Sequence, residues 1–81
     1  MATVQALLMS GTESLTLVSD TPRLDSEVLL ASALDTSRAS LYAWPEREVP
    51  APAAQTFEAR LARRAQGTPI SYITGAKELD R

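Results

Sequence analysis

The sequence predicts an all-α fold, a compact bundle of four to five short helices in a single small domain. Three observations lead to this prediction. Apolar residues recur three or four positions apart, which is the period of an amphipathic helix. Several of these segments begin at a capping residue or a proline, as helices commonly do. Only four of the 81 residues are aromatic, so the core must consist mainly of Leu, Val, Ile and Ala, which suits packed helices.

A first helix is expected over residues 3–18. Inside it, Gly11 is a weak point, because glycine costs about 1 kcal/mol relative to alanine in a helix. Gly11 could also split the segment in two, or let another helix approach closely. The expected apolar face consists of Val4, Leu7, Leu8, Gly11, Leu15 and Val18.

A second helix is expected to have Thr21 as its cap and Pro22 as its first helical residue. Its carboxylates Asp25 and Glu27 lie near the positive end of the helix dipole, and Arg23 can reach Glu27 at the i,i+4 spacing. Positions two residues apart on a helix point in different directions, so we interpret the two carboxylates as structural rather than catalytic. The expected apolar stripe consists of Leu24, Val28, Ala31 and Leu34, widened by Leu29 and Leu30.

Residues 35–37 can cap a short third helix that runs through Leu41 and Tyr42 and that Pro45 ends, since a residue before proline avoids the helical region. Trp44 could anchor a partner protein, because tryptophan is enriched at binding hot spots. For a lone tryptophan in so small a core, the favoured interpretation is a half-buried side chain that closes the bundle.

After a loop over residues 46–52, a fourth helix is expected over residues 53–66, with Ala54, Phe57, Leu61 and Ala65 facing inward. Three arginines, Arg60, Arg63 and Arg64, lie mainly outside this stripe, and Glu58 has no arginine at i+4. We therefore expect them to be exposed and unpaired, which makes them candidates for contact with an acidic partner. The alternative is an ordinary solvated face.

The last helical unit is expected to be a very short helix followed by an extended tail. Gly67 can adopt the positive φ that ends the preceding helix. Thr68 can cap the short helix, with Pro69 in its first position. Its apolar side chains are Ile70, Tyr72 and Ile73, and Gly75 ends it.

Composition excludes several classes of function. The chain has no cysteine and no histidine, so the commonest metal ligands and the usual general base are absent, and no catalytic, cofactor-binding or metal residue is assigned. Residues 1–54 carry three basic and seven acidic groups, whereas residues 55–81 carry five basic and three acidic groups. A pI of about 4.9 disfavours a nucleic-acid-binding protein. No apolar run suits a membrane span or a signal peptide, so we expect cytoplasmic residence.

Two segments carry a family resemblance: Pro22-Arg23-Leu24-Asp25-Ser26-Glu27-Val28-Leu29-Leu30, and Arg63-Arg64, Gly67, Pro69-Ile70, Tyr72-Ile73-Thr74-Gly75 and Lys77-Glu78 in that order. The chain resembles the N-terminal helical domain of HemK/PrmC-type peptide chain release factor N5-glutamine methyltransferases. That family transfers a methyl group from S-adenosylmethionine to the glutamine of the Gly-Gly-Gln tripeptide in class 1 peptide chain release factors.

The resemblance implies a substrate-recognition domain over residues 1–76, and the start of a linker to a methyltransferase domain over residues 77–81. In the family an aromatic residue usually follows the basic-Glu pair. In this chain Leu79, Asp80 and Arg81 follow that pair instead. The family's glycine-rich cofactor loop and Asn-Pro-Pro-Tyr motif have no counterpart here. The implied partners are a class 1 release factor, which Arg60, Arg63 and Arg64 would contact, and the protein's own methyltransferase domain. A purely structural module and a weak RNA-binding domain stay open as alternatives.

Overall fold

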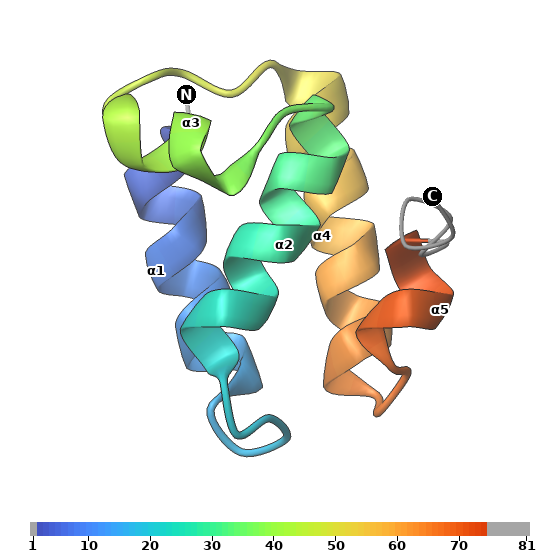
Figure 1. Cartoon of the computed structure of the whole chain (residues 1–81). Helices are drawn as coiled ribbons and strands as arrows, with labels where there is room; N and C mark the ends of the chain where they lie inside the picture. Colours follow the sequence, from blue (N-terminus) through green and yellow to red (C-terminus); the bar gives the residue numbers. More distant parts are fainter. Residues whose placement is uncertain (1, 75–81) are drawn as a thin grey trace.

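The computed structural model describes residues 2–74. Within them the chain forms the helices α1 (Val4–Leu15), α2 (Pro22–Leu34), α3 (Arg38–Ala43), α4 (Ala51–Ala65) and α5 (Ile70–Thr74). The predicted all-α bundle is confirmed. Figure 1 shows α2 between α1 and α4, with α3 near one end of the bundle and α5 beside α4. Since α2 contacts all four other helices, it is the central element of the domain.

One hydrophobic core joins the five helices and the loop before α4. Several partly buried residues pack against this core, namely a number of alanines, Leu34 and Ile70. Because no helix here is long enough to be stable by itself, packing on this shared core is what stabilises each of them. Its buried members are Val4, Leu7, Leu8, Leu15, Leu29, Leu30, Ala31, Leu41, Val49, Phe57, Leu61 and Ile73.

The first helix is shorter than predicted, and its glycine lets another helix approach closely, which is one of the roles proposed for it. Thr3 caps α1 by accepting a hydrogen bond from the Ala6 N–H at 3.1 Å. The chain turns after Leu15, so Val18 leaves the apolar face and is 42% exposed, contrary to the prediction. A Cβ on Gly11 would lie 2.6 Å from Ser26 Oγ. Gly11 therefore allows α1 and α2 to pack closely.

The second helix begins at Pro22, as predicted, and the predicted Leu29, Leu30 and Ala31 are buried in the core, but the buried surface differs in its first two turns. Leu24 is 39% exposed, whereas Asp25, Ser26 and Glu27 are buried. The predicted stripe is therefore wrong at Leu24, because hydrogen-bond donors from other helices meet the two carboxylates and allow them to be buried. Thr21 precedes the helix, but its side chain does not cap the backbone.

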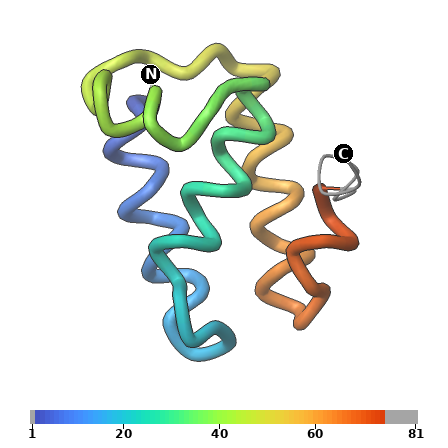
Figure 2. Tube along the Cα trace, in the orientation of Figure 1, coloured from blue at the N-terminus to red at the C-terminus, as the bar shows by residue number. Residues whose placement is uncertain are grey.

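The third helix is capped by Ser37, whose hydroxyl accepts from the Ser40 N–H at 3.3 Å. Trp44 follows the end of α3 and is 64% exposed, so the favoured half-buried interpretation is wrong. The reason lies in the connection that passes over one end of the bundle from α3 to α4, as the tube in Figure 2 shows. It is fixed to the start of α1 by hydrogen bonds from the Val4 N–H to the Arg47 carbonyl and from the Val49 N–H to the Ala2 carbonyl. In this connection Val49, not Trp44, fills the core.

The last two helices largely follow the sequence prediction. Phe57 and Leu61 are buried in α4, and Gly67 has φ 103° directly after it, both as predicted. Helix α5 begins at Ile70, so Pro69 precedes it and its carbonyl accepts the first hydrogen bonds. Of the apolar side chains named for this helix, Ile73 is buried in the core, whereas Tyr72 is 75% exposed. Gly75, the tail and the predicted domain boundary at residue 76 lie outside the described residues.

Candidate functional site

The three arginines predicted to bind a partner differ in their surroundings. Arg64 Nε lies 3.0 Å from Asp25 Oδ2, and only 17% of the Arg64 side chain is exposed. The expectation that Arg64 is exposed and unpaired is therefore wrong, because the first turn of α2 supplies a buried carboxylate that no local spacing in α4 reveals. Arg60 is half-buried and donates to the Ser32 hydroxyl. Arg63 is exposed, as predicted.

The carboxylate of Asp25 joins the turn between α1 and α2 to α4. Its Oδ2 accepts hydrogen bonds from the Ser19 hydroxyl at 2.6 Å and from Arg64. Its Oδ1 accepts from the Thr21 hydroxyl at 3.2 Å. These partners leave the carboxylate with a structural role, in agreement with the sequence interpretation.

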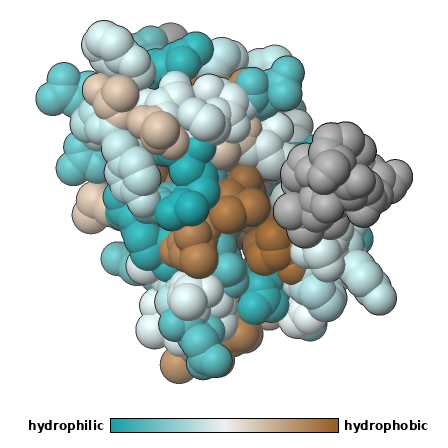
Figure 3. All heavy atoms as spheres, viewed as in Figure 1, coloured by the Kyte–Doolittle hydropathy of each residue, from teal (hydrophilic) through white to brown (hydrophobic). Residues whose placement is uncertain are grey.

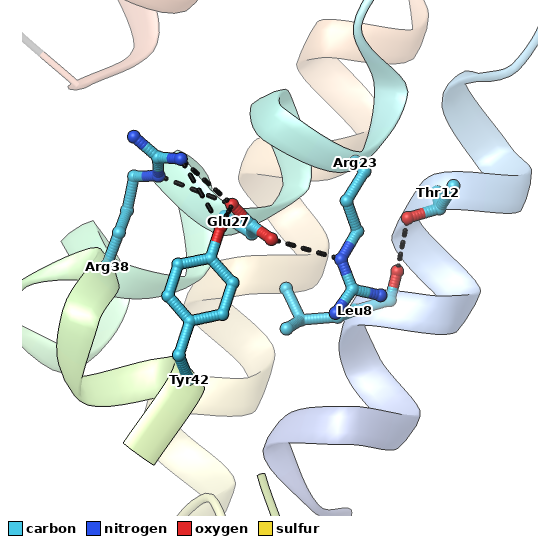
Figure 4. A network of polar contacts seen from close by, with 6 residues as sticks. All are labelled: Leu8, Thr12, Arg23, Glu27, Arg38 and Tyr42. Atoms are coloured by element: carbon cyan, nitrogen blue, oxygen red, sulfur yellow. Dashed lines mark hydrogen bonds and ion pairs between the residues drawn. The ribbon is translucent and has the colours of Figure 1, made fainter. Parts of the chain in front are cut away.

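The carboxylate of Glu27 joins α2 to α3. Its side chain is only 3% exposed and accepts from Tyr42 Oη at 2.7 Å, Arg23 Nε at 3.1 Å and Arg38 Nη2 at 3.2 Å, an arrangement shown in Figure 4. Burial alone would raise the pKa of Glu27, but the hydrogen bonds from Tyr42, Arg23 and Arg38 outweigh it and lower the pKa below its ordinary value. The sequence revealed only the Arg23 contact, because Arg38 and Tyr42 lie beyond any helical spacing from Glu27.

A hollow of about 470 Å³ lies against this cluster, between α1 and α3. We call it the α1–α3 groove. Two of its side chains are strongly exposed apolar or aromatic groups, since Met9 is 54% and Tyr42 58% exposed. The groove is lined by Gln5, Leu8, Met9, Arg23, Leu41, Tyr42 and Pro45.

A second hollow, of about 400 Å³, lies between α2 and α5. Figure 3 shows apolar surface in this part of the molecule, seen from the same side as Figure 1. Val28 and Ala31 contribute apolar atoms to the hollow, and Thr74, the last described residue, lines it too.

Comparison with known proteins decides the family. The family model described as the PrmC N-terminal domain matches residues 6–75. This chain belongs to that family. The resemblance found in the two sequence segments is thereby confirmed.

Curated relatives of this PrmC N-terminal domain are named release factor glutamine methyltransferase. The protein of Coxiella burnetii is 42% identical over 78 residues, which are 96% of this chain and 28% of the relative. The protein of Aliivibrio fischeri is 45% identical over 76 residues, covering 93% and 27%. The protein of Pseudomonas aeruginosa is 47% identical over 57 residues, covering 70% and 21%. The chain thus spans about a quarter of the length of these relatives, and no solved structure matches it.

The buried charged groups in the described part of the chain are engaged with other polar side chains. Both buried carboxylates, Asp25 and Glu27, are held by hydrogen-bond donors. Across residues 2–74, no group of three or more acidic side chains is placed to hold a metal ion. No helix of the same residues has the length and apolar character needed to cross a bilayer. The surface of the described residues carries exposed arginine, aromatic and apolar side chains and three hollows, the third lined by Trp44, Glu46 and Arg47.

Proposed function

We propose that this chain is the release-factor-recognition domain of a methyltransferase that methylates the glutamine of the Gly-Gly-Gln motif in class 1 peptide chain release factors. The carrying observation is its membership of the PrmC N-terminal domain family, together with relatives named release factor glutamine methyltransferase. In this proposal the domain binds and positions the release factor and does not catalyse. The site for S-adenosylmethionine and the methyl transfer belong to the part of the longer relatives that this chain does not match, and the protein works in the cytoplasm.

Positioning is a sufficient contribution for such a domain. A binding domain linked covalently to the catalytic domain raises the effective concentration of the release factor's Gly-Gly-Gln segment at a distant active site. Holding reactants in the correct geometry removes much of the entropic cost of the reaction. A bundle whose helices share one core is a suitable rigid support, because a preorganised surface loses little conformational entropy on binding.

The proposal predicts direct binding by the 81-residue chain. We expect isothermal titration calorimetry to detect binding between this chain and a class 1 peptide chain release factor. Arg63→Gln should weaken the affinity, and less so at high salt, because it removes an exposed positive charge.

A matched control for Arg63→Gln is Gln55→Glu, which changes the charge by the same amount at another exposed position of α4. Equal effects of the two variants would remove Arg63 as a contact and leave only long-range electrostatics. Absence of binding by the unmodified chain would contradict the recognition role itself.

The α2–α5 hollow favours a second candidate function, that of a structural module which stabilises and orients the methyltransferase domain. The hollow is partly apolar, and Thr74, the last described residue, lines it. Removal of the helical domain from a full-length relative distinguishes the two candidates. A lower melting temperature with unchanged release-factor affinity would favour the structural module, whereas lost affinity would favour recognition.

A further inference from the structure

We infer that the α1–α3 groove is a surface that binds the release factor, in addition to the contact proposed for Arg63, and that it accepts a protein segment presenting a carboxylate beside a bulky apolar side chain. This inference rests on the proposed function, because it names the surface and the partner chemistry through which the recognition would occur.

Exposed side chains give the groove its apolar character. Met9 and Tyr42 line it and are 54% and 58% exposed. Tyrosine is enriched at binding hot spots, and methionine adapts its shape to a partner. The buried side chains of Leu8 and Leu41 form an apolar wall behind them. A hollow of about 470 Å³ can receive a large side chain.

Arg23 gives the groove its positive charge, whereas Arg38 lines the α2–α5 hollow. Arg23 shares the single carboxylate of Glu27 with Arg38, so Glu27 does not neutralise both guanidinium groups. The hydrogen bond from Arg23 to Glu27 uses Nε. Figure 4 shows the terminal nitrogens of Arg23 directed away from Glu27, near Leu8, which lines the same groove. A guanidinium edge presented in this way can take a carboxylate in a bidentate pair.

The groove is also preorganised. The two carboxylate oxygens of Glu27 hold two different side chains of the groove. Oε2 accepts a hydrogen bond from Arg23, and Oε1 accepts one from Tyr42. The rim residues Gln5 and Pro45 are joined by a hydrogen bond of 2.9 Å from the Gln5 N–H to the Pro45 carbonyl. These contacts restrain the groove before a partner arrives, so binding orders few additional side chains. On α4, Arg64 is already neutralised by Asp25, so it is less suited than Arg23 to bind a carboxylate of the partner.

The test uses two opposite substitutions at one exposed position. Met9→Glu should weaken binding of the 81-residue chain to a class 1 release factor about tenfold or more, because it removes an apolar contact and repels the partner's carboxylate. Met9→Lys removes the same contact but attracts the carboxylate, so its loss should stay within about threefold. Leu17→Glu is the control, since Leu17 is 95% exposed and outside the groove lining. Circular dichroism confirms that each variant is folded, and calorimetry gives the dissociation constants.

The outcomes separate this inference from the proposed function. If the unmodified chain does not bind the release factor, the proposed function fails. If it binds, and Met9→Glu is no weaker than Leu17→Glu, the groove is excluded while the recognition role stands. Equal weakening by Met9→Glu and Met9→Lys would overturn the acidic character assigned to the partner segment.

Discussion

Ser26 of α2 packs tightly against Gly11 of α1. Its side chain is fully buried, and within the described residues its hydroxyl has no hydrogen-bond partner. A Cβ at Gly11 would lie 2.6 Å from Ser26 Oγ and 3.1 Å from Phe57 Cζ. Small residues on both helices are therefore what allows them to pack at this distance, at the cost of one unsatisfied hydroxyl.

Gly11→Ala should lower the free energy of unfolding by about 1–3 kcal/mol, because the overpacking exceeds the gain in helix propensity. In a Ser26→Ala background the loss should be smaller, because the nearest clashing atom is gone. Ser26→Ala alone should be neutral or stabilise the domain by about 1 kcal/mol, since it removes a buried unpaired hydroxyl. Urea denaturation of the four proteins forms a complete double-mutant cycle.

A suitable control is Ser14→Ala, which lies on the exposed side of the same helix. It should change the free energy of unfolding by no more than about 0.5 kcal/mol. Additive effects of Gly11→Ala and Ser26→Ala would show that the two positions do not constrain each other in solution.

Among the helices, α2 connects to its neighbours through carboxylates as well as through the core. Asp25 binds Arg64 of α4, whereas Glu27 binds Arg38 and Tyr42 of α3. The two carboxylates point in different directions, as their two-residue spacing requires. Each therefore fixes a different neighbouring helix.

The ion pair between Asp25 of α2 and Arg64 of α4 predicts that the adjacent residues Arg63 and Arg64 contribute differently to stability. Arg64→Gln should lower the free energy of unfolding by about 1–3 kcal/mol, because it leaves a largely buried carboxylate with fewer donors. Arg63→Gln is the matched control, and as an exposed substitution it should stay within about 0.5 kcal/mol. Thermal or urea unfolding measures both, and equal effects would refute the structural role of Arg64.

Across the whole molecule, one core cluster contains side chains from all five helices. Loss of a contact at one helix is therefore expected to affect a single cooperative unfolding transition, as small single domains usually show. Glu27 and the side chains that bind it belong to α2 and α3, and therefore to this cooperative unit. Protonation of Glu27 should consequently change the free energy of unfolding of the whole domain.

The folded-state pKa of Glu27 lies below its ordinary value. Its contribution to stability is therefore fully present above the pKa of the unfolded chain and is lost as the pH falls through the folded pKa. Glu27→Gln should lower the free energy of unfolding at pH 7 by about 1–3 kcal/mol. As the pH falls from about 5 to about 3, the Glu27→Gln variant should also lose less free energy of unfolding than the unmodified chain does.

Urea titrations of both proteins across this pH range measure the Glu27 effect. The expected result is a difference between the two stability curves that narrows as the solution becomes acidic. Curves that stay parallel would show that Glu27 does not titrate differently in the folded and unfolded chains.

The sequence by itself determined the helical class and most helix positions. Pro22, Pro45 and Gly67 act where the prediction placed them, because proline restricts the backbone locally and glycine permits the positive φ that ends a helix. Phe57 and Leu61 were predicted in the core for a similar reason, since helical periodicity is a property of neighbouring residues. The two family segments also lie in the sequence itself.

Only the tertiary structure decided which polar and aromatic groups are buried and paired. Arg64 meets Asp25 across 39 positions of the chain, and Tyr42 meets Glu27 across 15. Trp44 is exposed because the connection to α4 places Val49 in the core instead. Such contacts depend on how helices are arranged in space, which no spacing along one helix encodes. The α1–α3 groove exists for the same reason, since α1, α2 and α3 each supply part of its lining.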